Sequence, residues 1–224
     1  MLKRLFTSYD TPSRGGRFLF LLISIFLMMA LRPFVPGLVG VGFLMELFFS
    51  ILLFSGLYAV SQKKSVLITA SLLALPVFFA PWVGHLFKVS SFPVIGRIFG
   101  ALFFAYTAII ILSYLFTERD VTTDVIMAAI CAYFLIGIMW AFVFFLMEHF
   151  QPGSFRISPG LSPEIDSFIY FSFVTQTTLG YGDFSPVSAP ARSLSVLAAI
   201  VGQLYIAILI ARLVGIHITK SSNK

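Results

Sequence analysis

Long apolar runs, separated by short polar or basic segments, occur along most of this chain. The hydrocarbon core of a bilayer is about 30 Å thick, and a helix needs roughly 20 apolar residues to cross it. Several runs approach this length, so the pattern predicts an all-α membrane protein with six transmembrane helices. The expected spans are residues 18–31, 38–60, 65–80, 92–116, 125–147 and 188–214, and a shorter helix is expected over residues 163–177.

Composition and charge agree with a membrane protein. The chain has 224 residues, of which 59% are hydrophobic and 11% are charged, which is too apolar for a soluble domain. The formal net charge of +6 comes from basic residues that mostly flank the expected spans, so membrane topology explains it without a nucleic-acid partner. Of the 15 lysines and arginines, ten fall on the proposed inner side. This asymmetry predicts a multi-pass cell-membrane protein, in contact with membrane lipid, whose N- and C-termini are cytoplasmic.

The run Thr-Gln-Thr-Thr-Leu-Gly-Tyr-Gly-Asp at residues 175–183 carries the main chemical signal. A dehydrated cation needs rings of oxygens in place of its water shell, and main-chain carbonyls supply them only where successive peptide groups can turn toward one axis. Gly180 and Gly182 permit such backbone angles. The run resembles the selectivity filter of the potassium channel family, Thr-Val-Gly-Tyr-Gly-Asp, and departs from it by Leu179 in place of valine.

The resemblance implies where the permeant ion binds. Potassium ions are expected at the carbonyls of Thr178, Leu179, Gly180 and Tyr181, with the Thr178 hydroxyl as a further oxygen and Gly182 completing the loop. Residues 163–177 would then be a re-entrant pore helix. One such loop per chain requires four chains around one axis, so a homotetramer is expected. The resemblance implies no cofactor besides the permeant K⁺ and no enzymatic activity.

Residues before the loop are assigned roles by the same resemblance. Thr175 and Thr177 match hydroxyl residues that bind behind the filter in the family. Tyr170 and Phe171 match two aromatic positions that form a cuff around the filter tyrosine, here Tyr181. Tryptophan often occupies the second position and donates a hydrogen bond, which Phe171 cannot do, so the resemblance predicts a looser cuff.

Acidic residues cluster around the expected outer mouth. Asp183, Glu164 and Asp166 are expected to concentrate cations there. Val174 stands where some family members have a glutamate coupled to the filter, so that pair with Asp183 is absent. Glu148 has two interpretations, a residue that buttresses the filter mouth or an ordinary carboxylate at the membrane interface.

The last span contains three residues with candidate roles. Gly202 lies where many family members have a hinge glycine, and the alternative is close helix packing. Gln203 is polar within a span and is expected to face the cavity or another subunit. Arg212 is expected to extend toward the cytoplasmic interface.

Six spans with the pore last is the layout of voltage-gated channels, but the expected sensor helix has Arg97 as its one basic residue. One charge crossing 100 mV releases about 2.3 kcal/mol, so several are needed for steep voltage gating, which is therefore not expected. Glu46 and Arg97 are expected to form a structural ion pair, and a proton- or ligand-responsive Glu46 is the alternative. The expected organisation is an N-terminal cytoplasmic segment (1–17), a four-helix peripheral domain (18–116), a linker (117–124), a pore domain (125–214) and a cytoplasmic tail (215–224).

The leading functional hypothesis is a potassium-selective channel that conducts passively, from a prokaryotic source to judge by its compactness. Two alternatives remain open, an ion-translocating subunit of a potassium uptake system and a non-conducting or weakly selective regulatory membrane protein.

Overall fold

The computed structural model describes residues 16–31, 41–61, 63–87, 91–118, 120–158 and 164–222. These residues are mainly helical, as the hydrophobic pattern predicts. The elements are α1 (Arg17–Leu31), α2 (Val41–Ala59), α3 (Lys64–Phe87), α4 (Ser91–Thr117), α5 (Thr123–Phe150), β1 (Phe155–Ile157), α6 (Ile165–Gln176), β2 (Phe184–Pro186) and α7 (Ala189–Ser222).

Three helical segments of the described chain are long and apolar enough to cross a membrane, Val94–Thr117, Thr123–Phe150 and Ala189–Ile216. They lie in α4, α5 and α7. Arg17–Ala30, Phe49–Ala59 and Lys64–Ala80 are shorter apolar helices. The expectation of six spans is therefore met by length and composition for three of them, and the other three stay predictions.

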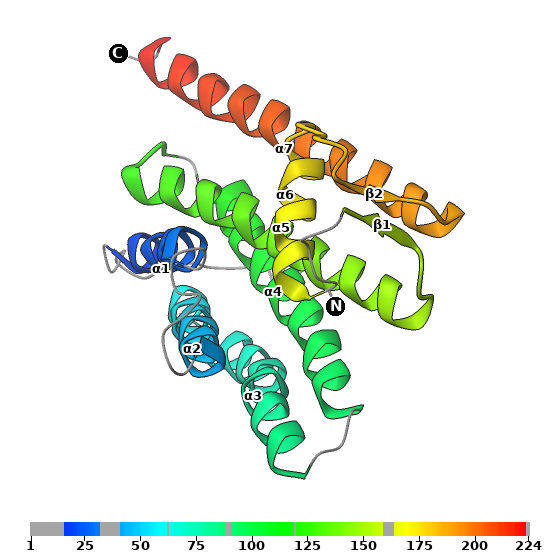
Figure 1. The fold of residues 1–224 in the computed structure, drawn as a ribbon. Helices are drawn as coiled ribbons and strands as arrows, with labels where there is room; N and C mark the ends of the chain where they lie inside the picture. The colour runs from blue at the N-terminus through cyan, green and yellow to red at the C-terminus, as the bar shows by residue number, and fades with distance from the viewer. Residues whose placement is uncertain are drawn as a thin grey trace.

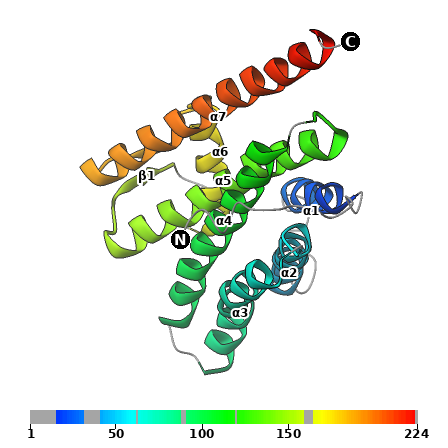
Figure 2. The same ribbon diagram turned by 180° about the vertical axis from the view of Figure 1, so that it is seen from behind.

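Helices α4 and α5 cross in the middle of the molecule (Figure 1). Helix α3 contacts α4, α1 contacts α2 and α5, and α6 lies between α5 and α7. Figure 2, the view from behind, shows the same order, with α2 and α3 at one end and α7 at the other. The core between α4 and α5 is aromatic, since Phe104 and Phe142 are buried and stack with ring centroids 5.5 Å apart.

A two-stranded sheet joins the segments on either side of α6, and the sequence pattern does not predict it. Strand β1 pairs with β2 in antiparallel fashion, with Phe155 opposite Pro186, Arg156 opposite Ser185 and Ile157 opposite Phe184. Helix α6 begins at Ile165, two residues later than expected, and Glu164 is its N-cap residue without a side-chain cap hydrogen bond. Helix α7 ends at Ser222, well beyond the expected residue 214.

Candidate functional site

The loop of residues 177–182 follows the C-terminus of α6 and is exposed throughout in the single chain. Gly180 and Gly182 have φ angles of 61° and 83°, in the left-handed region. An added Cβ at either glycine would meet nothing within 4 Å, so backbone conformation favours glycine there and lack of space does not. Thr178 also has a positive φ, of 60°, which costs a residue with a Cβ roughly 1–2 kcal/mol.

The peptide N–H groups of this loop turn back toward α6. The Val174 carbonyl oxygen accepts hydrogen bonds from the nitrogens of Leu179, at 2.9 Å, and Gly180, at 3.3 Å, while Thr178 N donates to the Thr175 carbonyl at 3.0 Å. Among the described residues, no hydrogen bond ends on the carbonyl oxygens of residues 178–181. The loop therefore uses its donors internally and keeps a run of consecutive acceptors for another partner.

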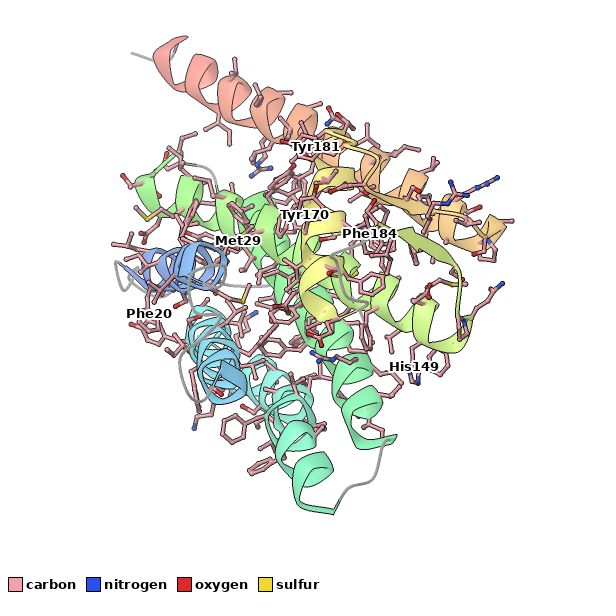
Figure 3. All side chains as sticks on the ribbon, in the orientation of Figure 1. Phe20, Met29, His149, Tyr170, Tyr181 and Phe184 are labelled. Carbon is pink, nitrogen blue, oxygen red and sulfur yellow. The ribbon has the colours of Figure 1, made fainter. Side chains whose placement is uncertain are left out.

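Asp183 closes the outer end of the loop and is held by two donors. The Tyr170 hydroxyl donates to Asp183 Oδ2 at 2.7 Å, and Phe184 N donates to Oδ1 at 3.0 Å. The Tyr170 and Tyr181 rings are nearly parallel, with centroids 6.5 Å apart. Figure 3 shows Tyr170, Tyr181 and Phe184 gathered where α6 meets β2. The hydrogen bond to Asp183, together with burial, raises the pKa of Tyr170 to about 12, so the hydroxyl stays a donor at physiological pH.

Phe171 lies in a buried cluster of phenylalanines behind β1 and β2. Its ring centroid is 4.7 Å from that of Phe184, 5.0 Å from that of Phe144 and 5.3 Å from that of Phe155. Phe168 completes the cluster, 5.2 Å from Phe184. Such pairs contribute about 0.5–1.5 kcal/mol each beyond their burial. Within one chain, Phe171 therefore supports the exit from the loop instead of surrounding the Tyr181 ring.

Glu148, near the end of α5, fixes the start of β1. Its two carboxylate oxygens accept hydrogen bonds from Gly153 N at 2.8 Å and Phe155 N at 3.0 Å. Beyond β1, Ser158 N donates to the Asp183 carbonyl at 3.0 Å. Hydrogen bonds at both ends of β1 thus link the Glu148 carboxylate to the outer end of the loop, an arrangement compatible with a buttressing role.

Gln176, the last residue of α6, was not singled out from the sequence. Its side chain is fully buried, and Nε2 donates to the Tyr133 carbonyl in α5 at 2.9 Å. A Cβ added at Gly137 would lie 3.0 Å from Gln176 Oε1, and one added at Gly202 would fall on the Gln176 carbonyl oxygen. The approach of α7 to α6 at Gly202 therefore favours the close-packing interpretation of this glycine over the hinge. The sequence signal was a glutamine at the end of an apolar helix, where a buried polar side chain needs a partner.

The hydroxyl residues around the inner end of the loop have hydrogen-bond partners within the single chain. Thr177 is exposed and its hydroxyl donates to the Phe173 carbonyl of its own helix at 2.7 Å. The Thr178 hydroxyl donates to the Thr177 carbonyl at 2.6 Å, and Gln203 Nε2 lies 3.5 Å from Thr178 Oγ1. Gln203 is exposed on α7 and reaches the inner end of the loop, whereas Thr175 contributes its main-chain carbonyl.

Arg212 does more than extend toward the interface. Its Nη2 donates to the Glu118 carbonyl at the end of α4 at 2.8 Å, and its guanidinium lies 5.1 Å from the Phe116 ring centroid. The sequence interpretation did not include these contacts because it considered the last span alone. Arg212 joins the far end of α7 to the segment that leads from α4 to α5.

Arg97 lies against α5. Its guanidinium is 5.2 Å from the Phe145 ring centroid and 5.9 Å from that of Phe142, and the Glu164 carboxylate is close enough to act on its charge. The side chain of Glu46 lies outside the described residues, so the expected pair of Glu46 with Arg97 stays a prediction. The contacts of Arg97 that the structure describes join the peripheral helices to the segments around the loop.

Comparisons with known proteins bear on the part of the chain that contains the loop. Residues 160–217 match the family model of ion channels, a stretch that takes in α6, the 177–182 loop and most of α7. This segment resembles an ion-channel domain. A stretch of 71 residues is 38% identical to the voltage-gated potassium channel Kch of Escherichia coli (strain K12), and it covers 30% of this chain and 17% of that protein. The chain therefore spans about a sixth of the length of the curated relative that it matches.

Proposed function

We propose that four copies of this chain assemble around one axis and conduct potassium passively and selectively across the cell membrane. The observation that carries the proposal is the 177–182 loop, because it lies in the ion-channel domain, is exposed in the single chain and leaves the carbonyls of residues 178–181 without an internal donor. Four such loops would surround an ion with rings of oxygens that replace its water shell.

In the assembled pore, each part of the site has a physical task. The carbonyls of Thr178, Leu179, Gly180 and Tyr181 form successive oxygen rings, and the Thr178 hydroxyl adds one at the inner end. The C-terminal end of α6 carries partial negative charge, which favours a cation just inside the loop. At the outer end, Asp183 concentrates cations, and its bond to Tyr170 fixes the carboxylate in place.

The surface of α7 supports assembly into an oligomer. Large apolar side chains along this helix are exposed in the single chain, among them Leu197, Ile200, Leu204 and Ile208. In a homotetramer these side chains would line the central cavity or contact the neighbouring α7. Gln203, exposed on the same helix, would present its amide to the cavity below the loop.

Steep voltage gating is not part of the proposal. Helix α4 has Arg97 as its one basic residue, and this guanidinium lies over two aromatic rings of α5. A helix held in this way and carrying one charge couples weakly to the membrane potential, since each charge contributes only about 2.3 kcal/mol per 100 mV.

Flux measured on the full chain in liposomes tests the proposal. We expect K⁺ efflux that external Ba²⁺ blocks, with Na⁺ passing at least about tenfold more slowly. Gly180→Ala should abolish this flux because an L side chain is strained at its positive φ. Gly16→Ala is the matched control, since Gly16 also has a positive φ, of 101°, and open space around it, but lies at the start of α1.

The possible outcomes separate the candidate functions. Sodium flux as fast as potassium flux would reject selectivity. A well-reconstituted tetramer that passes neither ion would favour the non-conducting regulatory protein, and Gly180→Ala behaving like Gly16→Ala would remove the loop from the conduction path.

A further inference from the structure

Strands β1 and β2 hold a fixed register beside the outer end of the 177–182 loop. Two residues beyond Asp183, Ser185 lies directly opposite Arg156. Just beyond the ladder, Ser158 N donates to the Asp183 carbonyl at 3.0 Å. Residues that lie directly opposite each other in an antiparallel pair project from the same face, with Cβ atoms about 4.5–5.5 Å apart. The Arg156 side chain therefore starts beside the exit from the loop.

The two faces of this strand pair differ in character. Phe155 and Phe184 are buried on one face, in the aromatic cluster behind the strands, with ring centroids 5.6 Å apart. Because side chains alternate along a strand, Arg156 projects from the opposite face, and its side chain is exposed there. A guanidinium stays charged throughout the physiological pH range. The sequence thus places a permanent cation next to the loop.

No ion pair cancels this charge within the described part of the chain, where the Arg156 side chain makes no hydrogen bond or ion pair. The carboxylates of this region have other contacts. Glu148 accepts hydrogen bonds from two main-chain nitrogens, Asp183 accepts one from a tyrosine hydroxyl, and Glu164 acts on the charge of Arg97. The outer end of the loop therefore has a negative charge at Asp183 and a separate positive charge at Arg156.

A fixed positive charge at an entrance acts on approaching ions according to their valence. The Coulomb energy of a divalent ion is twice that of a monovalent ion at the same position. Local concentration depends exponentially on this energy. A charge that lowers the local K⁺ concentration by a given factor therefore lowers that of a divalent cation by the square of the factor. Such a charge repels both ions but favours the monovalent one.

We propose that Arg156 is a specificity-determining residue at the outer entrance of the pore, where its charge admits K⁺ more readily than divalent cations. The inference rests on the proposed function, because it needs four loops around one axis. Asp183 attracts cations of every valence, and Arg156 repels divalent cations more strongly than K⁺. For charges about 15 Å from the entering ion, in about 10 mM salt, four copies lower the local K⁺ concentration about threefold and that of a divalent cation about tenfold.

Single-channel recording of the reconstituted full chain tests the inference. The two quantities measured are the inward K⁺ conductance and the rate of block by external Ba²⁺. In about 10 mM salt, Arg156→Gln should raise the K⁺ conductance about threefold and the rate of Ba²⁺ block about tenfold. In about 1 M salt the Debye length is only about 3 Å, so both quantities should then equal those of the wild type.

Three further variants serve as controls. Arg156→Lys keeps the charge and should behave like the wild type in both measurements. Lys64→Gln removes the same charge from an exposed residue at the start of α3, on the proposed inner side of the membrane, and should change neither quantity. Arg156→Glu reverses the charge and should raise the rate of Ba²⁺ block further than Arg156→Gln does. This series keeps the test decisive if one variant fails to assemble.

The outcomes separate this inference from the proposed function. Absence of K⁺ current in the wild type would overturn both. A K⁺ current and a rate of Ba²⁺ block that Arg156→Gln leaves unchanged at low salt would overturn this inference alone. Equal factors for K⁺ and Ba²⁺, or a change that persists in about 1 M salt, would also overturn it, because either result would indicate an altered loop shape instead of a charge acting at a distance.

Discussion

The hydrogen bond between Tyr170 and Asp183 gives the sharpest prediction about the loop, because Tyr170→Phe removes one oxygen and leaves the ring in place. The bond is short, at 2.7 Å, and its acceptor is charged, which places its contribution in the range of about 1.5–3 kcal/mol where water is excluded. Tyr170 is only half-buried in the single chain, and Asp183 keeps the bond from Phe184 N. Both facts reduce the stabilisation that Tyr170→Phe is expected to remove to about 1 kcal/mol per subunit.

Single-channel recording of the reconstituted protein measures the consequence. A loss of about 1 kcal/mol changes a local equilibrium about fivefold, so the mean open time of Tyr170→Phe should fall by at least this factor. Tyr58→Phe is the control, because it deletes the same atom from an exposed tyrosine of α2. Unchanged open times in Tyr170→Phe, or an equal effect in Tyr58→Phe, would refute the role of this bond.

The pH dependence of the same bond has a defined sign. Neutral tyrosine is the donor, and the Tyr170 pKa is raised from about 10 in the unfolded chain to about 12. The stabilisation is therefore fully present below pH 10 and is lost as the pH rises through about 12. Open times should be constant between pH 7 and 9. A decline in this window that Tyr170→Phe abolishes would contradict the assignment of the donor.

Three further predictions concern the supports of the loop. Gly202→Ala places a methyl group against the Gln176 carbonyl oxygen and should destabilise the protein by about 1–3 kcal/mol, measured as a lower unfolding temperature of the assembled protein. Loss of channel opening at an unchanged unfolding temperature would instead support the hinge interpretation of Gly202. Glu148→Gln leaves two main-chain N–H donors with one side-chain carbonyl acceptor, and it should lower the free energy of unfolding in chemical denaturation by about 1–2 kcal/mol. An unchanged free energy of unfolding would favour the interpretation of Glu148 as an ordinary carboxylate at the membrane interface. Arg212→Gln should change the open probability of the channel. Glu118→Gln should leave it unchanged, because Arg212 bonds to the main-chain oxygen of Glu118 and not to its carboxylate. Equal changes of open probability in the two variants would count against this hydrogen bond.

Much of the fold follows from the sequence because one physical rule dominates it. Apolar runs of near-bilayer length fold as helices, and α1, α2, α4 and α5 lie within three residues of the expected spans. Helix α3 is longer than expected and ends at Phe87 instead of residue 80. The position of the loop was also predictable, since Gly180 and Gly182 have the positive φ angles that a run of aligned carbonyls requires. Both signals lie within short stretches of neighbouring residues, and such short-range patterns can be recognised in a single sequence.

The missed features depend on contacts between distant segments. Strands β1 and β2 have three residues each, too few for alternation to be visible, and they form because Phe155 and Phe184 meet across the cluster behind α6. Gln176 has a partner only because α5 brings the Tyr133 carbonyl to it, 43 residues away along the chain. Arg212 likewise bonds to Glu118, 94 residues away. Buried or charged polar side chains such as these need hydrogen-bond partners, but the sequence does not show which distant residue supplies each partner.

Helix α5 connects nearly all of these contacts. At one end Glu148 holds β1, and near its middle the Tyr133 carbonyl holds Gln176. The Tyr205 hydroxyl of α7 donates to the Ala129 carbonyl at 2.6 Å, and the Cys131 thiol donates to the Phe18 carbonyl of α1 at 3.3 Å. A displacement of α5 would therefore disturb the loop, α7 and the peripheral helices together.

The role of Arg97 follows from this arrangement. Its guanidinium lies over Phe142 and Phe145 of α5, so moving α4 along the membrane normal would break cation–π contacts worth about 0.5–2 kcal/mol. We therefore propose that the peripheral helices act as a fixed brace for α5, which is the opposite of a moving voltage sensor. Arg97→Gln should lower the yield and thermal stability of the assembled protein and leave the voltage dependence of any current unchanged. Arg97→Lys, which keeps the charge, should restore part of the stability. A shifted voltage dependence at normal stability would show that α4 moves.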